Sequence, residues 1–464
     1  MSPTDDPVLR RGPFFAVLLQ GLPLAIGLAS HAVINLVDLA MVGRLGDDAV
    51  QSAHVATTWN FLPMIVGQVV STALLAQLSR QLGRGDVDGA RRRNVRAQVF
   101  MVWLGLALGV ASALPAALQV DAVGVTGAVR SEALHYLIVS NLGCLPMFVM
   151  MQTTAAMRAA GEAIAPLCVL LGANVINLGL DVVLLFGWPQ LGIPSVGVVG
   201  AAYASVVSRS IAAGFAIWWL RRPGHALPWR RVTAARDGAG GDLAVVAPLL
   251  RDAWPQAVQI VLRALVVVAL TVIVQQHFGD DVTVSLGVTT RLDTLVLFSS
   301  LGFASAATAY AGRAVPAGLV WRARLAGVAA AGQSMAFGAT FVWFYTAECE
   351  VVLRWFLPEP SPVTEHATGT YFGIAAWSQV LGAGALGAIG AVQGAGFMRA
   401  PMVVDLVAFA LAGALLWAAA QSDSMLADYY LVLVVGMAIV AVLQLALVLF
   451  GRWARAAAPE DLSA

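Results

Sequence analysis

Long runs of apolar residues, separated by short polar stretches, follow one another along the 464-residue chain. A helix needs about 20 such residues to cross the hydrocarbon core of a bilayer. Because lipid offers no partner to backbone polar groups, each run is predicted to be a helix, and the short alternating segments of a β-barrel are missing from the sequence. The runs number twelve, at residues 14–43, 49–79, 97–119, 133–157, 163–187, 196–220, 247–276, 283–311, 325–347, 367–393, 400–420 and 429–451.

The loops between these predicted spans alternate in charge. Arginines gather in one set of loops, at residues 80–96, 158, 221–236, 313–324 and 399. Acidic residues gather in the other set, at 47–48, 121, 280–281, 348–365 and 423–428. Cytoplasmic loops of membrane proteins carry an excess of basic residues. Both termini and the arginine-rich loops are therefore predicted to be cytoplasmic.

Two motifs recur in the same order half a chain apart. The segment "RLGDDAVQSAHVATT" at 44–58 resembles "HFGDDVTVSLGVTTR" at 277–291, and "GEAIAP" at 161–166 resembles "GFMRAP" at 396–401. An even number of spans in each half gives the halves the same orientation, as in parallel repeats related by an axis along the membrane normal.

The spans and the repeat together predict a fold. We expect an all-α polytopic membrane protein, with twelve transmembrane helices in two pseudo-symmetric six-helix lobes. The N-terminal lobe is predicted at residues 1–220 and the C-terminal lobe at 247–464, joined by a cytoplasmic linker at 221–246.

Composition narrows the class of function. Hydrophobic residues make up 59% of the chain and charged residues 11%, whereas a soluble domain carries about 25% charged residues. A net charge of +1 gives no reason to expect nucleic acid as a partner. Three scattered cysteines and six histidines without an HExxH spacing offer neither a disulfide framework nor a metal site. We therefore expect a membrane protein that is not an enzyme and holds no cofactor.

Carboxylates within the predicted spans are the first candidate functional residues. Asp38 follows a run from residue 14 to 37 without a charged side chain, and an ionised carboxylate inside a membrane helix costs roughly 2.5–3.5 kcal/mol. Asn174, Asn177 and Asp181 are spaced i, i+3, i+7, which places them on one helix face directed away from lipid. Such a face could hold a proton or gather oxygen ligands for Na⁺. The alternatives are a carboxylate that reaches the outer surface and a hydrogen-bonded seam between helices.

Other polar, aromatic and methionine residues lie in the predicted spans. Arg263 is expected to pair with a carboxylate or carbonyls of the C-terminal half, which also contains Asp293 and Asp405. For Arg209, the alternative to a functional role is a side chain that extends toward the cytoplasmic face. Soft and aromatic side chains such as Met64, Met151 and Trp377 suit a path for organic cations. The alternative for Met64, Met151 and Trp377 is ordinary packing in the membrane core.

Several motifs resemble the multidrug and toxic compound extrusion (MATE) family of transporters. These are "NLVDLAMVGRLG" at 35–46, "LSRQLGRGDVDGARR" at 78–92, and "MRAAGEAIAPLCVLLGANVINLGLDVVLLFG" at 157–187 followed by "GVVGAAYAS". The C-terminal half matches more loosely, through "GDD" and "GAGFMRAP". One branch of the family carries a glutamate in helix 7, where this chain has Arg263. The sequence is therefore closer to the DinF-like branch.

The resemblance implies a cation site in the N-terminal lobe. Family members with such a site use residues that match Asp38, Asn177, Asp181 and Ser205 here, with Asn174 alongside. The aromatic hydroxyl expected one turn before the helix 1 aspartate is replaced by Ile34. His31 and Asn35 are nearby and could compensate, and with Met64, Met151, Arg263 and Trp377 they are candidates for the substrate cavity.

The resemblance also implies a function. We expect a monomeric exporter in a bacterial inner membrane that moves organic, cationic small molecules out of the cell. Alternating access is driven by antiport of H⁺ or Na⁺, with Na⁺ a possible ligand of Asp38, Asn177 and Asp181. Two alternatives stay open, a flippase of lipid-linked oligosaccharides from the same superfamily and a membrane-embedded enzyme.

Overall fold

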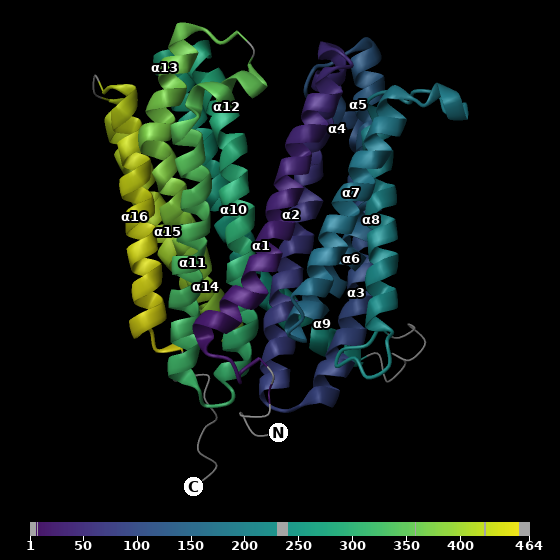
Figure 1. Cartoon of the computed structure of the whole chain (residues 1–464), viewed down its shortest axis with the longest axis vertical. Helices are drawn as coiled ribbons and strands as arrows, with labels where there is room; N and C mark the ends of the chain where they lie inside the picture. Colours follow the sequence, from purple (N-terminus) through teal and green to yellow (C-terminus); the bar gives the residue numbers. More distant parts are fainter. Residues whose placement is uncertain (1–5, 7, 230–239, 358, 422–423, 454–464) are drawn as a thin grey trace. The chain divides into compact units, whose positions relative to one another are not determined.

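Helices make up the fold, and within each of the two units described below they run roughly parallel to one another (Figure 1). The computed structural model describes residues 6, 8–229, 240–357, 359–421 and 424–453. The linker residues Arg230, Arg231 and Arg236, and the loop residue Asp423, lie outside this part of the chain.

The described part of the chain contains twelve segments that are long and apolar enough to cross a membrane, each a single helix or a run of consecutive helices. This confirms the predicted number of spans. They are α1 (Pro13–Gly43), α2 (Asp47–Gly83), α3 (Val87–Ala113), α5 with α6 (Gly127–Leu142 and Cys144–Ala159), α7 (Ile164–Phe186), α8 (Val199–Leu220), α9 (Gly240–Phe278), α10 (Asp280–Ala314), α11 (Val320–Ala347), α13 with η3 and α14 (Pro362–Thr370, Tyr371–Ala375 and Ala376–Gly394), α15 (Arg399–Ala420) and α16 (Leu426–Phe450). The short helices α4 (Ala116–Asp121), η1 (Pro189–Leu191) and α12 (Cys349–Phe356) connect them.

The third span differs most from its predicted limits of 97–119. Helix α3 begins at Val87 because the Asp86 side chain accepts a hydrogen bond from the backbone N–H of Gly89, 2.8 Å away, and caps the first turn. The helix ends at Ala113, shortly before Pro115, which cannot donate a backbone hydrogen bond. The prediction was wrong here because it treated the arginines at 91–96 as loop, whereas they occupy the first turns of the helix.

Contacts between residues divide the chain into two units. The first unit comprises residues 1–29, 79–85 and 252–464, and the second comprises 30–78 and 86–251. One boundary falls inside α1, between Ala29 and Ser30. The lobes expected from the sequence, at 1–220 and 247–464, stay a prediction.

Glycines allow close helix packing in the first unit. A Cβ atom at Gly387, Gly390 or Gly394 of α14 would lie 2.5, 2.2 or 2.4 Å from a backbone oxygen of α11 or α10. Similarly, a Cβ at Gly302 of α10 would lie 2.3 Å from the backbone N of Ala25 in α1. The glycines of α14 therefore let it pack closely against two neighbouring helices.

In the second unit, α7 packs against α8. Near the C-terminal end of α7, a Cβ at Gly200 of α8 would lie 2.8 Å from the carbonyl group of Leu184. This close approach fixes α7 on the helix that carries Ser205 and Arg209, and it positions the polar face described next.

Candidate functional site

The polar face of α7 is directed into the second unit. Asn174, Asn177 and Asp181 are 7%, 8% and 0% exposed, whereas Val175 and Val182 are 69% and 51% exposed. The seven-residue spacing read from the sequence therefore does place the two amides and the carboxylate on a buried face.

The carboxyl group of Asp181 meets that of Asp38, which α1 carries into the same region. The two side chains lie within hydrogen-bonding reach of each other. Both Asp181 oxygens and Oδ1 of Asp38 are buried without a hydrogen-bond partner among the described residues. Two ionised carboxylates have no donor to share, so a hydrogen bond between them requires that one of them holds a proton.

A hydrogen-bonded chain extends from Asn174 toward α1. Its Nδ2 donates to Oγ of Ser30 at 2.8 Å, and its Oδ1 lies 3.3 Å from Nδ1 of His31. This hydrogen-bonded chain ties α7 to α1 about two turns from the carboxylate pair. His31 therefore belongs to the polar network of this region, as its position in the sequence suggested.

Two residues near the carboxylates were missed or misread in the sequence. Arg209 of α8 interacts electrostatically with Asp38, and its Nη1 lies 3.9 Å from Sδ of Met147. These contacts speak against the alternative that Arg209 extends toward the cytoplasmic face. Tyr136 of α5 interacts with both carboxylates and supplies an aromatic hydroxyl that helix 1 lacks at Ile34.

A sequence signal existed for Arg209 but not for Tyr136. Arg209 lies near the middle of its span, about ten residues from either end of α8, a poor position for reaching the membrane surface. Tyr136 lies in an ordinary amphipathic stretch, and only the packing of α5 brings it to the carboxylates.

The remaining predicted coupling residues, Asn177 and Ser205, make fewer contacts with the carboxylates. Nδ2 of Asn177 is buried without a hydrogen-bond partner among the described residues, so this amide is available to the site. Ser205 is half-buried, and its carbonyl accepts a hydrogen bond from Ser208 at 3.1 Å. In the described part of the chain, no recorded hydrogen bond joins the Ser205 hydroxyl to either carboxylate.

The predicted cavity residues of the second unit differ in exposure. Asn35 is exposed on α1, while Met64 and Met151 are half-buried. Met151 packs closely on α2, because a Cβ at Gly67 would lie 2.8 Å from its sulfur. Both methionines are therefore only partly exposed, and Met151 also packs against a neighbouring helix.

Arg263 and Trp377 belong to the first unit. Trp377 is 41% exposed on α14. Nη2 of Arg263 lies 3.3 Å from Oδ2 of Asp405, an ion pair whose carboxylate side chain is fully buried. The expected pairing of Arg263 with a carboxylate of the C-terminal half is confirmed.

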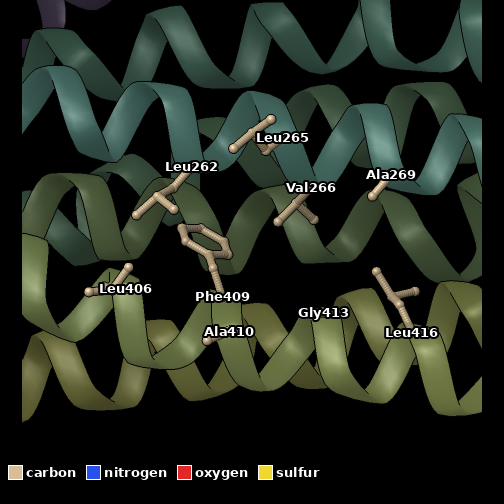
Figure 2. A pocket seen from close by; sticks show the side chains of 9 residues that line it. All are labelled: Leu262, Leu265, Val266, Ala269, Leu406, Phe409, Ala410, Gly413 and Leu416. Carbon is tan, nitrogen blue, oxygen red and sulfur yellow. The ribbon is translucent and has the colours of Figure 1, made fainter.

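An apolar pocket of about 200 Å³ lies between α9 and α15 (Figure 2). Its walls are Leu262, Leu265, Val266, Ala269, Leu406, Phe409, Ala410, Gly413 and Leu416. None of these side chains carries a polar group, so the pocket has nothing with which to recognise a charged ligand. No group of three or more His, Cys, Asp or Glu side chains in the described residues could hold a metal ion.

Comparisons with known proteins place this geometry in context. The family model MatE matches residues 23–183 and 255–418, two stretches that begin half a chain apart, as the internal repeat does. The chain is 29% identical over 410 residues to a probable multidrug resistance protein NorM from Deinococcus radiodurans, covering 86% of each protein. It is 24% identical over 408 residues to the protein of the same name from Agrobacterium fabrum, covering 85% of this chain and 84% of that one.

Solved structures show the same fold. A crystal structure of MATE in complex with MaL6 superposes with a TM-score of 0.84 at 18% identity, covering 97% of both chains. At this identity the likeness concerns the fold alone.

Proposed function

The chain belongs to the MatE family of multidrug efflux transporters, and from this membership we propose an exporter of organic cations driven by antiport of H⁺ or Na⁺. The protein is a multi-pass membrane protein rather than an enzyme. Its N-terminal-half carboxylates, and Arg263 in place of a helix 7 glutamate, support a place in the DinF-like branch.

The observation that carries the proposal is the pair Asp38 and Asp181. Two carboxyl groups meet with three of their four oxygens lacking a partner among the described residues. An uncompensated charge inside a membrane protein is costly, so such groups mark ion or proton paths. The pair is therefore the best candidate for the coupling site.

Counting charges suggests how many ions the pair takes. With both carboxylates ionised and Arg209 close to Asp38, the local charge is one unit negative. One H⁺ or one Na⁺ restores neutrality. We propose that Asn177 contributes to this site, and that Asn174 holds α7 and α1 in register around it.

Ion binding can drive export only if the ion binds one conformation better than the other. Because the carboxylates come from two different helices, neutralising them removes a repulsion that opposes close approach of α1 and α7. The occupied and empty states thus favour different positions of α1. A membrane potential supplies about 2.3 kcal/mol per charge per 100 mV, besides any concentration gradient.

We propose that His31, Asn35, Met64 and Met151 of the second unit contact substrate and, as a separate proposal, that Trp377 of the first unit does. Exposed aromatic and methionine surface suits flat, cationic organic molecules. Arg263 adds no net charge to a substrate path, because Asp405 neutralises it.

The flippase alternative is disfavoured by the same contacts. A carrier of lipid-linked oligosaccharides needs positive charge for the diphosphate. Two of the arginines inside spans are already beside carboxylates, Arg209 near Asp38 and Arg263 against Asp405.

Reconstituted proteoliposomes separate these functions. We expect ethidium to be moved against its gradient when a pH gradient or a Na⁺ gradient is imposed, and not when both are absent. The same vesicles should leave a lipid-linked oligosaccharide in its original leaflet. Oligosaccharide translocation without ethidium transport would overturn the proposal, whereas the dependence on one gradient identifies the coupling ion.

A further inference from the structure

Asp293 of α10 is a buried carboxylate in the first unit, whereas Asp38 and Asp181 belong to the second. It is 9% exposed, and the ion pairs of the described residues do not include it. Arg291 is exposed and, two residues away on a helix, faces another direction. Asp293 therefore lacks the counter-charge that Asp405 receives from Arg263.

Tyrosines surround this carboxylate. The Tyr371 hydroxyl donates a hydrogen bond to Oδ2 of Asp293. Tyr345 of α11 is close enough to interact electrostatically with Asp293, and its buried hydroxyl has no hydrogen-bond partner among the described residues. Tyr430 of α16 packs its ring 5.2 Å from that of Tyr371, and its hydroxyl is also buried and unpartnered there.

These groups come from four elements other than α10. Helix α11 provides Tyr345, η3 provides Tyr371 and α16 provides Tyr430, while Gln379 of α14 interacts with the Tyr371 hydroxyl. None of these side chains carries a positive charge. The cluster is a pocket of neutral hydroxyl and amide groups around one acid.

Asp293 lies too far along its helix for its side chain to extend to a membrane surface. It lies thirteen residues after Asp280, the first residue of a 35-residue helix, which at 1.5 Å per residue is about 20 Å along the axis. An aspartate side chain is far too short to reach the end of the helix from there. The group must be neutralised where it stands.

The backbone is specialised at the same point. Tyr371 is the first residue of η3, a π-helical turn inserted between α13 and α14. Such wide turns are rare and occur often at functional sites, where they re-aim a side chain. Here the turn directs the Tyr371 hydroxyl at the carboxylate.

We propose that Asp293 is a second proton-binding carboxyl group, distinct from the Asp38 and Asp181 pair. Tyr371 donates to Oδ2, so the proton binds Oδ1 and turns the carboxylate into a neutral acid. The new O–H group can then donate to a neighbouring phenol oxygen. A proton suits the cluster better than Na⁺, because a hard metal cation needs more oxygen ligands than one carboxyl and a few hydroxyls provide.

Infrared spectroscopy of the purified full-length protein tests the site directly. A protonated carboxyl group has a C=O stretching band that an ionised carboxylate lacks, and the band shifts in D₂O. At neutral pH, we expect the spectrum of Asp293→Asn to lose one such band relative to wild type. Asp121→Asn is the control, and we expect it to lose none because the Arg130 guanidinium, 2.5 Å from the Asp121 carboxylate, holds the pKa of that group below its usual range. An unchanged carboxyl region in Asp293→Asn would overturn the proposal.

A milder pair of variants keeps the test valid if Asp293→Asn does not fold. Tyr371→Phe removes the hydrogen bond to Oδ2, so the band should move to higher frequency without disappearing. Tyr429→Phe is the control, because its hydroxyl donates to the carbonyl of Ala419 at 3.3 Å instead. A band that does not move in Tyr371→Phe would contradict the site.

The role of this proton in transport rests on the proposed function. The proposal that Asp293 binds a proton does not depend on it. If the protein is an H⁺ antiporter, Asp293→Asn should lower the number of protons exchanged per ethidium by one. If ethidium transport fails altogether, the infrared result still decides whether Asp293 holds a proton. The two proposals can therefore fail separately.

Discussion

Nη2 of Arg263 lies 3.3 Å from Oδ2 of Asp405, and this contact links α9 to α15. The carboxylate also accepts hydrogen bonds from Gln259 at 2.8 Å and from Gln444 of α16 at 2.7 Å. Every oxygen of Asp405 thus has a donor. In the pair Asp38 and Asp181, by contrast, three of the four carboxylate oxygens have no hydrogen-bond partner among the described residues.

Breaking this pair from one side should destabilise the protein. Asp405→Asn leaves the Arg263 charge without compensation, and loss of one partner of a buried ion pair costs about 3–5 kcal/mol. We expect a clear fall in the thermal unfolding temperature of the detergent-solubilised protein. The double variant Arg263→Gln with Asp405→Asn removes both charges and should recover most of the loss. If the double variant loses as much stability as Asp405→Asn and Arg263→Gln lose together, the broken ion pair is not the cause of the destabilisation.

Packing along α14 should be sensitive to a single methyl group. In Gly390→Ala, the new Cβ would lie 2.2 Å from the carbonyl oxygen of Ala304 in α10, and overpacking of this kind costs about 1–3 kcal/mol. Gly382→Ala is the control on the same helix, since its nearest neighbour is the Met437 sulfur at an ordinary 3.6 Å. Thermal unfolding should show a loss for the first variant and none for the second. Equal stability of the two would contradict the close packing.

Arg209 should weaken cation binding at the carboxylate pair. Its positive charge interacts with Asp38, so Arg209→Gln leaves the pair with more negative charge. The affinity for the coupling cation should rise, roughly tenfold for a charge at this range. The H⁺ or Na⁺ concentration that gives half-maximal ethidium efflux should fall accordingly.

Arg130→Gln provides the comparison for that measurement. Arg130 is an exposed arginine that pairs with Asp121 at 2.5 Å, so its loss should leave the half-maximal concentration unchanged. A shift of the same size in both variants would mean that the effect is not local to the site.

Hydropathy and charge were sufficient to predict the helices. Twelve runs and their loops follow from what a bilayer excludes, and the limits of α7 agree with the prediction to within a residue at each end. The inward face of α7 also followed, because helical spacing alone aligns Asn174, Asn177 and Asp181. Both are local properties of the chain.

What the sequence could not supply were partners distant along the chain. Nothing in it distinguished Asp405 from Asp293 as the partner of Arg263, since both are single carboxylates in apolar helices. The grouping of residues 1–29 with residues 252–464 was equally hidden. It depends on close contacts such as that of Gly302 with Ala25, which hydropathy does not encode.

A control carboxylate outside the membrane completes the design for the coupling site. Asp121 lies at the end of α4, between two spans. Hydrogen bonding from the Arg130 guanidinium holds the pKa of Asp121 below its usual range, so it is ionised at physiological pH. Asp121→Asn therefore makes the same chemical change as Asp38→Asn, at a place where no coupling is expected.

Gradient-driven ethidium transport by Asp38→Asn and by Asp181→Asn, in proteoliposomes beside Asp121→Asn, tests the coupling site most directly. Both site variants should fold as wild type does but lose the response to an imposed H⁺ or Na⁺ gradient, because a neutral amide cannot exchange a cation. Asp121→Asn should respond fully. Wild-type gradient-driven transport in both site variants would contradict the account.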